Sequence, residues 1–268
     1  MGKLGDKAGE ILGKIRSAKP VVHNITNYVV MNSTANVLLS MGASPIMAHA
    51  PEEVEEVVRI ASSVVINIGT LSEPWIDSMI KAAWAATGQG KPCVLDPVGA
   101  GATALRTETS KRIIREALPT VIRGNASEIL ALSTDTGDTR GVDSVHSVDD
   151  AAMAAQEIAA SLGTVIAVTG VRDLVTDGKT TLVIDGGHPL MAMVTGTGCA
   201  ASAIVGAFIA VEHDPIAATA SALAFFGLAG EKAAQQANAP GTFWVKVLDA
   251  LYDITPDELA AQARIAPL

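Results

Sequence analysis

The segment Thr195–Cys199 combines two glycines, two threonines and a cysteine, and an apolar, helix-compatible stretch, Ala200–Val211, follows it directly. This pattern predicts a loop that enters the N-terminus of a helix. Backbone N–H groups there have no partner within the helix, and the helix dipole favours an anion. Gly196 and Gly198 allow the backbone to approach a ligand closely. An anion site next to a reactive side chain is typical of phosphoryl transfer, although short Gly-x-Gly loops are often purely structural.

Cys199 is the reactive side chain beside this predicted anion site. A helix N-terminus lowers the pKa of a cysteine thiol, so Cys199 is a candidate base or nucleophile. The alternative is a small buried side chain, the more common place of a cysteine. The sequence leaves both interpretations open.

Polar segments also follow several apolar runs that have the length of strands. They are Ile68–Thr70, Asp96–Gly101, Arg123–Glu128 and Thr169–Gly170. In α/β proteins, ligand sites gather at the carboxyl ends of the strands. We therefore expect these four segments to meet Thr195–Cys199 along one rim of a sheet.

Asp96 and Glu128 are the carboxylates of these segments. Beside an anion site they suit Mg²⁺, which usually takes one or two carboxylates together with phosphate oxygens. Each residue also has a structural interpretation. Asp96 precedes Pro97 and could form a turn or cap, and Glu128 lies three residues after Asn125, the spacing of a capping box. The segment 21–27 is dense in hydrogen-bonding side chains, and it either contacts a small polar ligand or caps the helix that follows.

The chain alternates between strand-like and helix-like stretches, which predicts a mainly parallel sheet with helices on both faces. The predicted strands are 46–48, 64–68, 93–95, 120–122 and 165–168. The predicted helices are 28–41, one that opens at 51–53, 73–86, 107–117 and 149–161. The pair Asp177-Gly178 predicts an antiparallel hairpin of 173–176 with 179–184 that ends the sheet. After Gly198 we expect only helices, over 200–211, 215–237 and 243–252.

Composition fits one globular domain over residues 1–268, because 49% of the residues are apolar and 18% are charged. The net charge of −9 argues against nucleic acid as a partner. Two cysteines provide no disulfide framework, the first ten residues lack an apolar signal core, and no apolar stretch is long enough to cross a membrane. We expect a cytoplasmic protein. The irregular segment 133–147 is interpreted as a surface loop, with a mobile flap as the alternative.

Five motifs together resemble the hydroxyethylthiazole kinase family of the ribokinase-like superfamily, over roughly residues 15–252. They are Val22–Asn27, Gly42–Met47, Asp96–Ala100, Arg123–Glu128 and Thr195–Cys199. The resemblance implies a ribokinase-like three-layer α/β sandwich. It also implies the phosphorylation of 4-methyl-5-(2-hydroxyethyl)thiazole by ATP and Mg²⁺, a salvage step of thiamine synthesis, in a homotrimer with active sites at the subunit interfaces.

The resemblance and the polar segments together predict the site residues. Predicted substrate residues are Asn24, Met47, Gly69 and Gly196; predicted ATP residues are Arg123, Thr169 and Gly198; predicted metal residues are Asp96 and Glu128. Cys199 is the predicted catalytic residue. The resemblance places it where many ribokinase-like enzymes carry a catalytic aspartate.

Two alternatives remain at this point. One is an ATP-dependent lyase of the same superfamily that repairs hydrated nicotinamide nucleotides (an NAD(P)H-hydrate dehydratase). Sequences of that kind carry aspartate where this chain has Cys199, which counts against it. The other is a non-catalytic ligand-binding relative, against which the presence of Glu128 and both glycines argues.

Overall fold

The structure, a computed structural model, describes residues 2–133 and 148–268, so most of the predicted loop or flap at 133–147 lies outside the described residues. The strands are β1 (Val21–Ile25), β2 (Ser44–Ile46), β3 (Ser63–Asn67), β4 (Cys93–Asp96), β5 (Val121–Asn125), β6 (Val165–Thr169), β7 (Arg172–Thr176), β8 (Thr181–Asp185) and β9 (Ile265–Pro267). They form one sheet in the order β2-β1-β3-β4-β5-β6-β7-β8-β9. Strands β1–β6 pair in parallel, and β7–β9 are added antiparallel.

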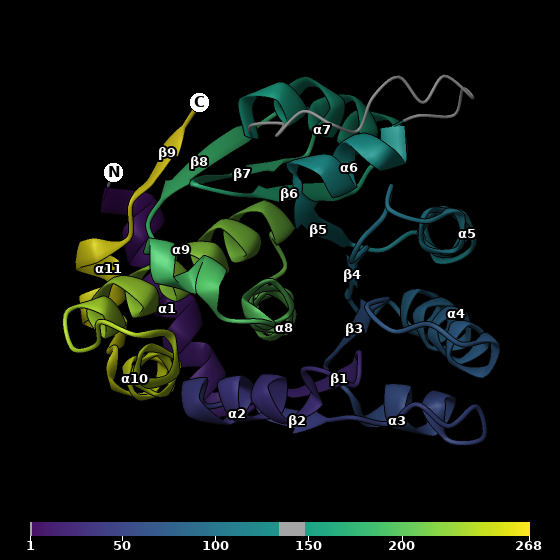
Figure 1. The fold of residues 1–268 in the computed structure, drawn as a ribbon, viewed down its shortest axis with the longest axis horizontal. Helices are drawn as coiled ribbons and strands as arrows, with labels where there is room; N and C mark the ends of the chain where they lie inside the picture. Colours follow the sequence, from purple (N-terminus) through teal and green to yellow (C-terminus); the bar gives the residue numbers. More distant parts are fainter. Residues whose placement is uncertain (1, 134–147) are drawn as a thin grey trace.

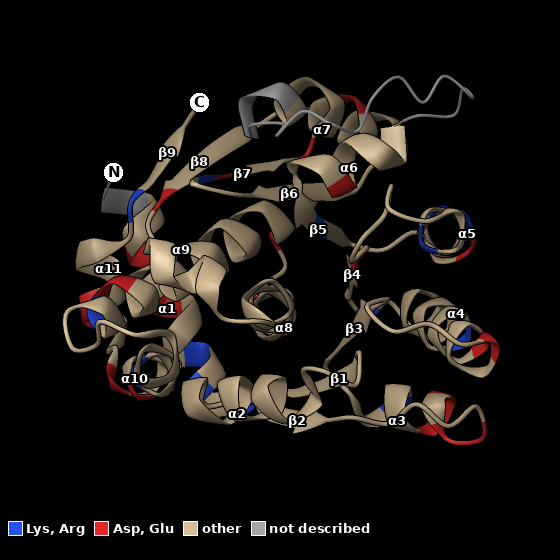
Figure 2. Ribbon diagram, in the orientation of Figure 1, with Lys and Arg blue, Asp and Glu red and all other residues tan. Residues whose placement is uncertain are grey.

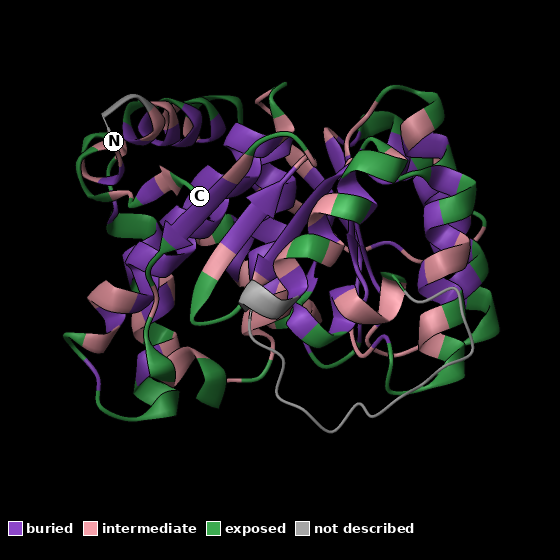
Figure 3. Cartoon of the chain, turned by 90° about the horizontal axis from the view of Figure 1, so that it is seen from above, coloured by how far each residue is buried: buried purple, intermediate pink, exposed green. Residues whose placement is uncertain are grey.

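Helices cover both faces of this sheet, which gives the predicted three layers (Figure 1). One face carries α3 (Val54–Ile60), α4 (Glu73–Gly88), α5 (Ala104–Ala117), α6 (Ala126–Ser133) and α7 (Val148–Leu162). The other carries α1 (Gly2–Ala18), α2 (Met31–Met41), the 3₁₀-helix η1 (Pro189–Met193), α8 (Thr197–Ile209), α9 (Pro215–Ala234), α10 (Pro240–Asp253) and α11 (Pro256–Gln262). The buried sheet between the two layers is clear in Figure 3.

The central strands are mostly apolar because both of their faces are buried, and their polar residues lie mainly towards the strand ends. In β3, Val65 packs into the core on the side of α8, while Val64 and Ile66 pack into the core on the side of α4. Pairing with β4 sets Ile66 beside Leu95 and Asn67 beside Asp96. The register therefore places two polar side chains together at the carboxyl end of these strands.

Charged residues lie mostly on the helices (Figure 2). Within the six parallel strands, all of which are described, the Asp, Glu, Lys and Arg residues are Asp96 and Arg123 alone. Both are buried, with 0% and 8% of their surface exposed. Burying a charge is costly unless the charge has a partner, so these two residues mark a site rather than a solvated surface.

Two expectations about the ends of the chain are wrong. The hairpin of β7 and β8 does not end the sheet, and the chain after Gly198 is not wholly helical, because β9 pairs antiparallel with β8. The edge strand escaped notice because it has only three residues and ends in Pro267. Its first residue, Ile265, is buried against the core. Among the described residues, no helix is long and apolar enough to span a membrane.

Candidate active site

Six of the predicted site residues line a single small cavity of about 150 Å³. The cavity lies where β4 and β5 end and α8 begins. Its lining residues are Asp96, Val98, Arg123, Asn125, Glu128, Gly196, Gly198 and Cys199. The structure thus brings together the predicted metal residues, the predicted catalytic residue and three residues predicted to bind substrate or ATP.

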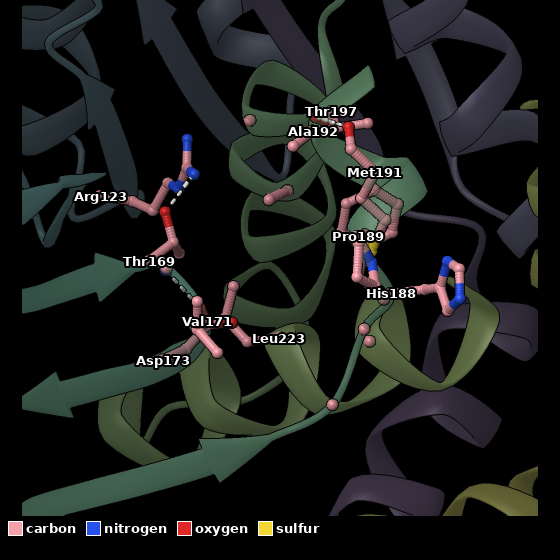
Figure 4. A pocket seen from close by; sticks show the side chains of 17 residues that line it. Arg123, Thr169, Val171, Asp173, His188, Pro189, Met191, Ala192, Thr197 and Leu223 are labelled. Atoms are coloured by element: carbon pink, nitrogen blue, oxygen red, sulfur yellow. Dashed lines mark hydrogen bonds between the residues drawn. The ribbon is translucent and has the colours of Figure 1, made fainter. Parts of the chain in front are cut away.

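A larger cavity of about 630 Å³ adjoins the small one, since Arg123 and Gly198 line both. In Figure 4, Arg123 and Thr169 lie on one side of the large cavity, and Pro189 and Met191 lie on the opposite side. The other walls come from the β6–β7 turn and from α9, and they are largely apolar. A cavity with apolar walls and a cationic end suits a ligand that has a flat apolar part and an anionic part.

Helix α8 begins at Thr197, three residues before the predicted start. Gly196 caps it with a φ of 86°, a left-handed conformation that favours glycine. Thr197 donates from Oγ1 to the carbonyl of Met191 at 3.0 Å, which anchors the first turn to η1 (Figure 4). Gly198 and Cys199 therefore belong to the first helical turn, whose N–H groups have no partner within the helix.

Asp96 is held through one of its two oxygens. Its Oδ2 accepts hydrogen bonds from Asn67 Nδ2 at 2.8 Å and from Ser202 Oγ at 2.9 Å, and Arg123 Nη1 lies 3.8 Å from it. Its Oδ1 is buried and has no hydrogen-bond partner among the described residues. Burial raises the pKa of Asp96 to about 6, although the charge of Arg123 lowers it.

Arg123 joins the two cavities. Its Nη2 donates to Thr169 Oγ1 at the end of β6, while Nη1 faces Asp96. The backbone of Gly198 passes directly beside the guanidinium, since a Cβ at this position would lie 2.8 Å from Nη1. The guanidinium group and the helix N-terminus thus form one surface that is suited to the oxygens of a phosphate.

Glu128 forms the capping box that its spacing from Asn125 suggested, and it also lines the small cavity. Its Oε2 accepts from the N–H of Asn125 at 2.8 Å, and Asn125 Oδ1 accepts from the N–H of Glu128 at 2.9 Å, which is a reciprocal capping box. Its Oε1 accepts from the N–H of Gly99 at 2.8 Å. Backbone contacts therefore hold the carboxylate in place at the wall of the cavity.

The expectation that the helix N-terminus lowers the pKa of Cys199 is wrong. Burial, followed by the negative charge of Asp96, raises the pKa of the thiol to about 11. Asn27 Nδ2 donates to its sulfur at 3.5 Å and only partly opposes this effect. Cys199 is a neutral thiol at neutral pH in the free protein.

Comparison with known proteins adds to this geometry. Residues 12–257 match the hydroxyethylthiazole kinase family. The chain belongs to that family. Hydroxyethylthiazole kinase of Desulfotalea psychrophila is 56% identical over 265 residues, covering 99% of this chain and 97% of the relative. The enzyme of Pyrococcus furiosus is 53% identical over 258 residues, with 96% and 97% covered.

The fold of the family is the one described above. A solved structure of hydroxyethylthiazole kinase from Pyrococcus horikoshii OT3 superposes with a TM-score of 0.90 at 47% identity, and the match covers 97% of this chain and 98% of that one. A ribokinase-like superfamily protein of Enterococcus faecalis V583 matches with a TM-score of 0.64 at 16% identity, a likeness of fold alone. These relatives favour a family kinase over the lyase and the non-catalytic alternatives.

The donor set at the small cavity fits Mg²⁺, the metal expected for a kinase of this family. The buried, unpartnered Oδ1 of Asp96 is an oxygen that a cation would satisfy. Each oxygen of Glu128 accepts one backbone N–H and keeps a further lone pair for a cation or for its water. Mg²⁺ commonly binds in this way, through one or two carboxylates and retained waters.

Three predicted substrate residues line neither cavity: Asn24, Met47 and Gly69. Asn24 is 1% exposed within β1, where its Nδ2 donates to the carbonyl of Val22. Met47 directly follows β2 and is partly buried. Gly69 follows β3, and a Cβ there would lie 2.5 Å from Asn27 Nδ2. Their assignment to the substrate stays a prediction.

Sequence reasoning missed two polar residues that hold the site together, Asn67 and Ser202, and it included Asn27 only as part of the polar segment 21–27. Asn67 was visible as a polar residue that ends an otherwise apolar strand. Ser202 lies three residues after Cys199, on the side of α8 that faces the sheet, a spacing that one turn of helix brings together. Both signals depend on knowing what lies opposite, which here is Asp96.

Proposed function

We propose that this chain transfers the terminal phosphoryl group of ATP to the primary hydroxyl group of 4-methyl-5-(2-hydroxyethyl)thiazole. The observation that carries this proposal is the meeting of the two cavities at Arg123 and Gly198. The large cavity, of about 630 Å³, has the volume and the apolar walls for a nucleotide. The small cavity has an anion-binding helix N-terminus and two carboxylates, and it offers room for the reacting groups.

Positioning and charge neutralisation do most of the work in phosphoryl transfer. Arg123 and the N–H groups of the first turn of α8 would hold the phosphoryl oxygens from one side. Asp96 and Glu128 would hold Mg²⁺, which offsets the negative charge of the phosphates when it is bound. The alcohol oxygen attacks phosphorus, the bond from phosphorus to the bridging oxygen of ADP breaks, and the hydroxyl proton passes late, in a loose transition state, to a phosphate oxygen or to water.

Cys199 lies in the small cavity as the predicted catalytic residue. Because its thiol is neutral at pH 7, it serves mainly to position the alcohol. The fraction of Cys199 in the thiolate form, which accepts a proton better than the thiol, increases as the pH rises. This assignment explains how a chain without an aspartate at this position can still support transfer.

The substrate pocket is completed by neighbouring copies of the chain in the homotrimer that we propose. Support comes from large apolar side chains that stay exposed near the entrance to α8: Tyr28, Val29 and Met193 are 65%, 64% and 67% exposed. Val30, which directly follows Tyr28 and Val29, contacts the position where a Cβ of Gly196 would lie. Apolar surface of this kind is typical of an interface. The single-domain organisation and the cytoplasmic location stay predictions from the sequence.

The direct test measures ADP release by the purified protein with MgATP, with and without the thiazole alcohol. We expect release that depends on the alcohol, together with formation of the thiazole phosphate. The Asp96→Asn variant provides the control, since it should lose most of this activity. Release of ADP with hydrated NADH but not with the alcohol would support the lyase, and binding of ATP without turnover would support a non-catalytic relative.

A further inference from the structure

Two asparagines connect the predicted catalytic cysteine to the predicted metal carboxylate. The Oδ1 of Asn27 accepts a hydrogen bond from the N–H of Val29 at 3.1 Å. A backbone N–H can only donate, so this contact sets the orientation of the amide. The Nδ2 of Asn27 is therefore turned towards Asn67 Oδ1 at 2.8 Å and towards Cys199 Sγ at 3.5 Å.

The orientation of Asn67 is set in the same way. Its Oδ1 accepts from the N–H of Gly69 at 3.0 Å and from Asn27 Nδ2. Its Nδ2 consequently donates to Asp96 Oδ2 at 2.8 Å. Asn67 is 1% exposed, and the β3–β4 register holds it opposite Asp96. Every polar atom of this side chain thus has one defined partner or pair of partners.

This arrangement leaves the two oxygens of Asp96 unequal. Oδ2 receives Asn67 and Ser202, whereas Oδ1 is buried without a partner among the described residues. We propose that Asn67 is a positioning residue that fixes Asp96 by one oxygen and so presents the other oxygen to a divalent cation. The inference rests on the proposed function, which assigns Asp96 to the cation.

The same side chain also connects the cation site to the rest of the small cavity. Through its Oδ1, Asn67 holds the N–H of Gly69 and, by way of Asn27, the sulfur of Cys199. Ser202 shares the contact with Asp96 Oδ2 but makes no contact of this kind with Gly69 or Asn27. Loss of Asn67 should therefore affect two properties, and loss of Ser202 only one.

The test measures binding of Mn²⁺, as a spectroscopic substitute for Mg²⁺, to the protein with ADP present. Free Mn²⁺ is counted by electron paramagnetic resonance. Hydrogen-bond partners of metal ligands typically contribute about 10–100-fold to metal affinity, so we expect Asn67→Ser to weaken Mn²⁺ binding by about that factor. Asn67→Gln keeps both chemical ends of the side chain but displaces them, and we expect a loss of the same order.

Two further variants complete the set. Ser202→Ala should weaken Mn²⁺ binding while the KM for the thiazole alcohol stays unchanged, whereas the Asn67 variants should alter both. Asn238→Ser changes an exposed asparagine before α10 and should match the wild type. Thermal unfolding of each variant shows that the comparison is made on folded protein, and Asn67→Gln serves in case Asn67→Ser does not fold.

The outcomes separate this inference from the proposed function. If Asp96→Asn abolishes Mn²⁺ binding and a folded Asn67 variant binds Mn²⁺ within twofold of the wild type, Asn67 is not a positioning residue and the inference is overturned. If Asp96→Asn itself leaves Mn²⁺ affinity unchanged, the assignment of Asp96 to the cation is wrong, and the inference fails with it.

Discussion

Gly198 and Arg123 are in such close contact that the site has no room for a side chain between them: a Cβ at Gly198 would lie 2.8 Å from Nη1 and 3.4 Å from Nη2. The guanidinium can move away only by giving up its contact with Thr169, because Nη2 is bonded to Thr169 and Arg123 is 8% exposed. A methyl group at this position would push Arg123 out of the place where the two cavities meet.

We expect Gly198→Ala to raise the KM for ATP by about tenfold, the effect of roughly 1.4 kcal/mol of lost binding. Stability should change little, since alanine is favoured over glycine in a helix and this offsets the crowding. Steady-state kinetics and thermal unfolding check both points. Gly88→Ala is a matched control, because Gly88 also lies in a helix and a Cβ there would meet nothing within 4 Å. Equal KM values in the two variants would contradict the role of Arg123.

Cys199 should contribute to turnover without being essential. Cys199→Ala should lower kcat and leave the activity that the helix N-terminus, the metal and positioning provide. Cys199→Asp should keep or raise kcat, because a carboxylate is ionised at neutral pH whereas the thiol is not. The pKa of the thiol is about 11, so the ratio of wild-type kcat to that of Cys199→Ala should rise from pH 7 to pH 9.5. A ratio of one throughout would show that the thiol only fills space.

Glu128→Gln should reduce turnover, and higher Mg²⁺ should recover part of it. The amide keeps the shape of the side chain but places an NH₂ group against the N–H of Gly99 or Asn125, where the carboxylate now accepts from both. Turnover as a function of Mg²⁺ concentration measures the effect. Wild-type behaviour at limiting Mg²⁺ would mean that Glu128 is a capping residue only.

Asp96→Asn should abolish most of the activity and yet stabilise the metal-free protein at neutral pH. The pKa of Asp96 is about 6 in the folded state and 3.8 ordinarily, so the folded state binds its proton more tightly. The associated stability is present below pH 3.8 and is lost as the pH rises through 6. A shift of about two units corresponds to about 3 kcal/mol.

The measurement for this prediction is chemical unfolding of wild type and variant at pH 4.5 and pH 8 without divalent metal. We expect the stability difference in favour of Asp96→Asn to be larger at pH 8. A difference that does not depend on pH would show that Asp96 carries no burial penalty.

Light scattering should give about three times the chain mass of 27.4 kDa. The apolar side chains left exposed beside the start of α8 need a partner, and a ring of three copies would cover them. Val29→Glu, at one of these positions, should shift the mass towards that of a single chain and reduce activity. A fully active species of 27.4 kDa would refute the shared pocket.

The sequence predicted the strands at 93–95 and 165–168 because each is an uninterrupted apolar run, and the strand at 64–68 because Asn67 alone interrupts its apolar run. It did not predict β1 as a strand, since His23 and Asn24 interrupt the pattern, although both are buried. It did not predict α1 either, because the first turns are polar and only Ile11, Leu12 and Ile15 reveal the buried face.

Some residues of the site could likewise be predicted from the sequence, and others could not. Asp96 and Arg123 could be predicted because topology alone sends strand ends to one rim. The role of Asn67 could not, because it depends on the register that pairs β3 with β4. The pKa of Cys199 was predicted with the wrong sign because burial and the charge of Asp96 exist only in the folded structure.

The contact between Asn27 and Cys199 joins residues that are 172 positions apart, and Ser202 reaches Asp96 across 106. Loop-closure entropy makes contacts between residues so far apart in the chain slow to form, so we expect these contacts late in folding. During refolding, helical structure should therefore return before the small cavity exists. Regain of activity after dilution from denaturant would time the last step of the folding reaction.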